Sequence, residues 1–130
     1  METTILKVDP EKRRFWGWAY VAKNADGTQV VDHSGDFVDD DAFPAFEDAA
    51  YNYVLESREG DLEHKSFGAA RLIEHVVMTP AKAEMMGLPG DVPTGMWVGY
   101  QADDDSLWEG VKSGRLKSLS IVGKGRREQV

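Results

Sequence analysis

The residue best suited to chemistry in this chain is Ser120, which interrupts an apolar, strand-like stretch at residues 116–122. Gly123 and Gly125 follow it, and a glycine-rich turn leaves backbone N–H groups free to hold an oxyanion. A serine hydroxyl becomes a nucleophile when a base removes its proton, and His64 upstream can take that role. The pattern predicts acyl transfer by Ser120 and His64; the structural alternative is a serine that fills a strand and a histidine on a surface loop.

Three neighbouring positions bear on the same chemistry. Ser118 lies two residues before Ser120 on the same face of the predicted strand and is the rival nucleophile. Glu74 and His75 fall within another predicted strand, so one faces inward and the other outward. An inward acid or imidazole would orient His64 as the third member of a triad does. The alternative is a solvent-facing Glu74 and a hydrogen-bonded His75.

Other polar clusters are better explained by structure. Residues 32–36 place Asp, His and Ser side by side, but adjacent side chains diverge on an extended chain, so a polar turn is favoured. The acidic runs 39–41 and 103–105 precede expected helices, where carboxylates cap the backbone. No metal-ligand spacing is present, and residues 122–125 lack the full pattern of a phosphate-binding loop. We therefore expect no metal and no cofactor.

The elements that must position these residues are short strands and two helices. Alternation of large and small residues or apolar runs predict strands, and apolar residues at helical spacing from about Phe43 predict the first helix. The expected strands are 5–8, 14–22, 70–78, 95–102 and 116–122. The first expected helix ends near residue 57, and residues 59–61 terminate it. The second expected helix spans 105–113. Residues 80–95 form a long loop with one helical turn at 81–86, which shapes access of substrate. The prediction is a single α+β domain over 1–130, a mostly antiparallel curled sheet or small closed β-barrel flanked by about two helices.

Composition narrows the functional classes. The chain has 130 residues, a formal charge of −8 and no cysteine, which disfavours nucleic-acid binding and excludes thiolate chemistry. No apolar run is long enough for a membrane span, and the N-terminus lacks the apolar core of a signal peptide. We expect a soluble cytoplasmic protein that binds neither nucleic acid nor membrane.

Several short motifs follow one another along almost the whole chain. They are the Gly-Trp-Ala-Tyr-Val strand at 17–21, Asp-x-x-Gly-Asp-x-Val at 32–38, Glu-x-Val-x-x-Thr-Pro at 74–80, Pro-Thr-Gly-Met-Trp at 93–97, the segment 107–114, and Leu-Ser-Ile at 119–121. With these motifs in this order, the chain resembles the phage serine proteases of the XkdF type, relatives of the prohead maturation proteases.

The resemblance implies a herpesvirus-assemblin-like fold, a closed antiparallel barrel surrounded by helices. It implies a serine endopeptidase that cuts scaffold or major capsid protein during phage head assembly, in the host cytoplasm or the prohead, and that can form a homodimer. The family's nucleophile matches Ser120 rather than Ser118, and its histidine matches His64. The third member matches Glu74 before His75, and the oxyanion would be held by N–H groups near residues 123–125.

Two departures from the family pattern leave a second function open. Related proteases usually continue into another strand that carries an acidic residue or histidine, whereas this sequence stops at Val130. Relatives also often carry glycine directly after the Ser-Ile pair, where this chain has Val122. The third member is therefore expected upstream or is missing. The alternative function is a non-catalytic capsid, scaffold or portal assembly module that retains the protease fold.

Overall fold

Six strands and three helices make up the part of the chain that this computed structural model describes, residues 2–31, 37–56, 59–62 and 66–121. At 2–3, 59–62, 66–68 and 118–121 it describes the backbone alone. The elements are β1 (Glu2–Asp9), β2 (Arg14–Lys23), α1 (Phe43–Glu56), β3 (Glu59–Leu62), β4 (Ser66–Met78), α2 (Pro80–Met85), β5 (Thr94–Ala102), α3 (Asp105–Lys112) and β6 (Ser118–Ile121).

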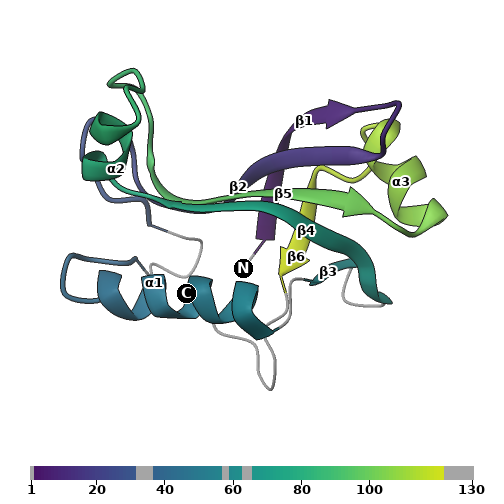
Figure 1. Cartoon of the computed structure of the whole chain (residues 1–130), viewed down its shortest axis with the longest axis horizontal. Coiled ribbons are helices and arrows are strands. Elements are labelled where there is room, and N and C mark those ends of the chain that lie inside the picture. The colour runs from purple at the N-terminus through teal and green to yellow at the C-terminus, as the bar shows by residue number, and fades with distance from the viewer. Residues whose placement is uncertain (1, 32–36, 57–58, 63–65, 122–130) are drawn as a thin grey trace.

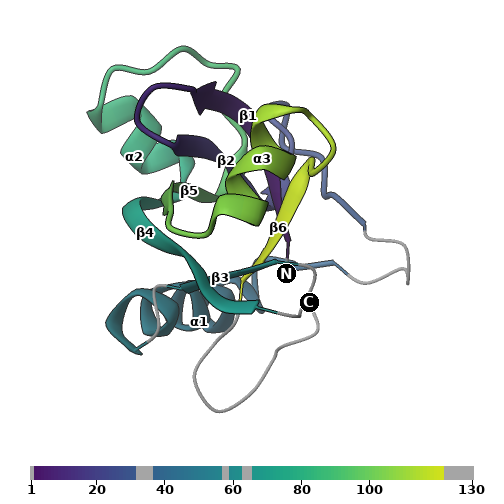
Figure 2. The ribbon, with the colours of Figure 1, turned by 90° about the vertical axis from the view of Figure 1, so that its right-hand side faces the viewer.

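All strand pairs are antiparallel, in the order β1-β2-β5-β4-β3-β6. β6 also pairs with β1, so the ladder closes on itself as a barrel. The four long strands make most of the curled wall, and the short strands β3 and β6 complete the ring (Figure 1, Figure 2). The predicted α+β class, with a mostly antiparallel curled sheet or small barrel, is confirmed.

The tight curvature of the wall depends on bulges and on two glycines. The register shifts within the β1–β2, β2–β5 and β4–β5 pairs, and such irregularities bend strands and increase their twist. A Cβ atom at Gly17 would lie 1.8 Å from the backbone oxygen of Thr4, and one at Gly95 would lie 2.1 Å from that of Tyr20. Only glycine lets the neighbouring backbone approach so closely at these two positions.

The core lies between the inner face of the sheet and α1, which runs along one side of it (Figure 1). Phe46, Ala50 and Tyr53 are buried at helical spacing on α1. The ring of Phe15 stacks on that of Tyr100, with centroids 5.7 Å apart. The hydroxyls of Tyr53 and Tyr100 share a buried hydrogen bond of 2.6 Å. This polar contact links α1 to β5 within the core.

The helices follow their predicted boundaries, with one addition. α1 begins at Phe43, and α3 is capped by Asp104, whose carboxylate accepts a hydrogen bond of 2.8 Å from the backbone N–H of Leu107. α2 is a third helix; its six residues lie within one position of the helical turn expected at 81–86 in the loop 80–95. The side chain of Thr79 caps it, and Pro80 occupies its first turn, where proline loses no hydrogen bond.

The strand β3 corrects the sequence-based prediction, which treated residues 59–61 as the end of a helix. A Glu-Gly-Asp segment has low intrinsic preference for a strand. β3 forms because β4 supplies ladder partners on one side and β6 on the other. β4 also starts at Ser66, before the predicted Ala70, because this added length pairs with β3.

Candidate active site

Ser120 lies in β6, the short strand that closes the barrel. In the backbone register it is opposite Glu2 of β1 and Asp61 of β3. Ser118, the rival nucleophile, is opposite Thr4 of β1. A strand that is paired on both sides is a rigid support for a nucleophile, because both neighbouring ladders restrain its backbone.

Three of the predicted site residues, His64, Gly123 and Gly125, lie outside the described residues. The roles of His64 as base and of the glycine turn as oxyanion site therefore stay predictions. Chain connectivity puts His64 between the end of β3 at Leu62 and the start of β4 at Ser66. This connection leaves the strand that directly neighbours β6, so the predicted base follows closely on Asp61, the register partner of Ser120.

Asp61 is a site candidate that the sequence did not reveal. Opposite residues of antiparallel strands have Cα atoms about 4.5–5.5 Å apart, so the register puts an acidic residue beside the candidate nucleophile. The signal in the sequence was the acid just upstream of His64. It became meaningful only once β3 was known to pair with β6.

Glu74 lies in β4 on the solvent-exposed face of the sheet. Its Oε1 accepts a hydrogen bond of 2.7 Å from the indole Nε1 of Trp16, and its register partner in β5 is Gly99. β3 lies between β4 and β6, so two strand spacings, about 10 Å, separate Glu74 from the strand of Ser120. The strand register thus brings Asp61 next to Ser120 and does not bring Glu74 there.

His75 points the opposite way from Glu74, as expected for successive strand residues, and is half-buried beside α1. Its ring meets that of Tyr51 edge-on, with centroids 6.1 Å apart. Among the described residues, its Nε2 is buried without a hydrogen-bond partner. Burial lowers the pKa of His75 below its ordinary value, and the positive charge of Lys82 lowers it further. His75 is therefore held neutral at the boundary between α1 and β4.

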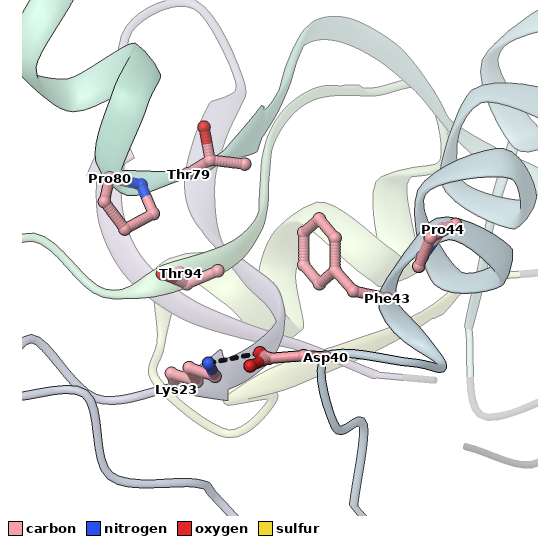
Figure 3. Close-up of a pocket in the computed structure, with 7 residues that line it drawn as sticks. All are labelled: Lys23, Asp40, Phe43, Pro44, Thr79, Pro80 and Thr94. Carbon is pink, nitrogen blue, oxygen red and sulfur yellow. Dashed lines mark hydrogen bonds and ion pairs between the residues drawn. The ribbon is translucent and has the colours of Figure 1, made fainter.

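A pocket of about 280 Å³ opens where β2, β5, α1 and α2 meet. Figure 3 shows its lining: Lys23, Asp40, Phe43, Pro44, Thr79, Pro80 and Thr94. Its chemistry is an apolar wall of ring and methyl groups beside one ion pair, in which Lys23 Nζ lies 2.5 Å from Asp40 Oδ1. Since that pair already satisfies its own charges, the pocket suits an apolar group. α2 lies well away from β6 in both ribbon views, so this pocket is separate from Ser120 (Figure 1, Figure 2).

Within the described ranges, no three histidine, aspartate or glutamate side chains gather as metal ligands would. The same part of the chain contains no helix long and apolar enough to cross a membrane. What the described site offers is a serine on a doubly paired strand with an acidic register partner. This arrangement is compatible with nucleophilic chemistry at Ser120.

Comparison with known proteins identifies the family. The family model described as "Putative phage serine protease XkdF" matches residues 2–129. The chain belongs to this family. The resemblance drawn from the motifs is thereby confirmed, and the XkdF family connects the chain to phages and to serine proteases as a class.

A relative of the chain is the uncharacterized protein YqbD of Bacillus subtilis (strain 168). The two are 28% identical over 94 residues, which are 72% of this chain and 28% of that protein. The chain thus spans little more than a quarter of the length of this relative. No solved structure matches the chain.

Proposed function

We propose that this chain is a phage prohead-type serine endopeptidase that cleaves scaffold or capsid protein during head assembly. The observation that carries the proposal is the position of Ser120, on the strand that closes the barrel, in a chain that matches the XkdF family over residues 2–129. The proposed partners are the scaffold and major capsid proteins, with a second copy of the chain as a homodimer. The proposed location is the host cytoplasm and the prohead.

In the proposed reaction, the Oγ of Ser120 attacks the carbonyl carbon of the scissile peptide bond. His64 takes the hydroxyl proton and then gives it to the leaving amine, so the peptide bond breaks as an acyl-enzyme ester forms. Backbone N–H groups near Gly123 and Gly125 hold the oxyanion of each tetrahedral intermediate. Water, deprotonated by His64, then releases the acid product and restores the serine.

The orienting acid has two candidates. The family pattern matches Glu74, whereas the backbone register favours Asp61, because Asp61 is opposite Ser120 and Glu74 is two strands away. Substitutions Asp61→Asn and Glu74→Gln separate them. The variant that lacks the orienting acid should lose most of its activity, since the imidazole then loses its favoured tautomer.

Labelling with a fluorophosphonate tests the nucleophile directly. Wild type and Ser118→Ala should be labelled, and Ser120→Ala should not, with circular dichroism and thermal unfolding to show that all three proteins are folded. Ser118→Ala is the matched control because it removes the same hydroxyl two positions away on β6. Equal labelling of Ser120→Ala and wild type would refute the assignment. A folded wild type that is not labelled at all would favour the non-catalytic assembly module.

A further inference from the structure

Three tryptophans lie together on the outer face of the sheet. In the register, Trp16 of β2 is opposite Lys7 of β1 and Gly99 of β5. One step along, Trp18 of β2 is opposite Trp97 of β5. Opposite residues of an antiparallel pair share a face, so these indoles form one surface, the tryptophan platform (Trp16, Trp18 and Trp97).

The platform faces solvent rather than the core. The alternating residues of the same strands, such as Phe15, Val98 and Tyr100, are fully buried and point to the inside of the barrel. Each of the three tryptophans keeps partial exposure. Clustered, half-exposed tryptophans on a small domain are typical of binding surfaces, because they bury much apolar area on contact with a partner.

The platform is held rigid by its own contacts. The Nε1 of Trp16 donates a hydrogen bond to Glu74, and the ammonium of Lys7 lies 5.6 Å from the centre of the same ring. Trp18 and Trp97 meet edge to face, with centroids 5.2 Å apart. A Cβ atom on Gly99 would lie 2.5 Å from Trp16 Cδ1, so the glycine makes room for the indole to lie across β5. Side chains fixed in this way lose little entropy when a ligand binds.

The same face continues to the strand of the candidate nucleophile. Thr4 of β1 is opposite Trp18 on one side and Ser118 of β6 on the other, and Ser120 follows two residues later. β1 alone separates β6 from β2, so Trp18 lies about 10 Å from β6 and Trp97 about 15 Å. An extended peptide advances about 3.3 Å per residue, so three to five residues span this distance. Thr4 is exposed, and its small side chain leaves room for a peptide to pass between β6 and the tryptophan platform.

We propose that the tryptophan platform binds a bulky apolar side chain of the peptide substrate, three to five residues from the scissile bond. The proposal rests on the proposed endopeptidase function and adds a substrate class to it. Lys7 is exposed on β1 opposite Trp16, so its positive charge lies at the end of the platform away from Ser120 and not on the path between them. The preferred substrate is therefore an extended segment with an aromatic or large aliphatic residue three to five positions from the cleaved bond.

Two kinds of active-site probe test the subsite. The first is a bare fluorophosphonate, and the second carries the same reactive group on a peptide arm with a phenylalanine at the third, fourth or fifth residue from phosphorus. A matched arm has alanine in place of phenylalanine. The variants are Trp18→Thr and Trp97→Thr, which keep a strand-forming residue, and the control is Leu55→Ala, which removes an exposed apolar side chain from α1.

For wild type and Leu55→Ala, the phenylalanine arm should label about tenfold faster than the alanine arm, a difference of about 1.4 kcal/mol. Trp18→Thr and Trp97→Thr should lose most of this advantage while the bare probe labels them at the wild-type rate. An unchanged ratio in both variants would overturn the subsite, and so would an equal loss with bare and armed probes, because damage to the fold lowers both. If the bare probe does not label folded wild type, the proposed function fails first, and the subsite falls with it.

Discussion

Substitution of Gly17 by alanine should displace β1, the strand that pairs with Ser120 on β6. Gly17 lies in β2 opposite Ile5, and an added Cβ would be 1.8 Å from the backbone oxygen of Thr4. Relief requires that this contact open to at least 3.0 Å, so β1 must move by at least 1.2 Å. A ladder hydrogen bond stretched by that amount is lost. Because Glu2 at the start of β1 pairs with Ser120, the displacement reaches the candidate nucleophile through a single strand.

The expected loss of unfolding free energy follows from the hydrogen bonds and packing contacts that must break. Loss of two ladder hydrogen bonds costs about 2 kcal/mol, and the disturbed packing of β1 on the core adds about 1 kcal/mol. The expected loss of about 3 kcal/mol lowers the melting temperature by roughly 10 °C for a domain of this size. Urea unfolding followed by tryptophan fluorescence measures the free energy, and labelling by the bare fluorophosphonate reports on Ser120.

Gly90→Ala is the matched control, because a Cβ atom at Gly90 has no neighbour within 4 Å. It should leave both unfolding and labelling within error of wild type. The reasoning would be refuted if Gly17→Ala unfolded within about 0.5 kcal/mol of wild type, a change typical of a harmless surface substitution.

Two further predictions concern a helix cap and a buried imidazole. Asp104→Ala should lower the unfolding free energy by about 1 kcal/mol, because the N–H of Leu107 loses its acceptor. Asp105→Ala should cost less, since it removes only an exposed ion pair. Equal losses of stability in thermal unfolding would contradict the role of Asp104 as the cap. The pKa of His75 in the folded protein is below its ordinary value of 6.5, so the unfolded chain binds more protons and stability falls as the pH drops below that value. His75→Gln should show a weaker fall in urea midpoint between pH 7.5 and pH 5.5, and an unchanged slope would show that His75 is not its source.

The local elements of this protein were predictable because their signals are short-range. The alternation around Phe15, the helical spacing of Phe46, Ala50 and Tyr53, and the carboxylate of Asp104 each act within a few residues. Ser120 became a candidate nucleophile for the same reason, as a polar residue within an apolar strand followed by glycines, and the family resemblance chose it over Ser118; its catalytic role stays a prediction.

The sequence by itself thus determined the α+β class, most element positions and the family, and it proposed Ser120 as the nucleophile. Only the tertiary structure decided what lies beside Ser120, because the register between distant strands depends on pairing across the whole barrel rather than on local preference. β3 exists through its partners β4 and β6, and that pairing puts Asp61 opposite Ser120. The same long-range ladders collect the three tryptophans on one face, two of them two strands from β6 and Trp97 three strands from it.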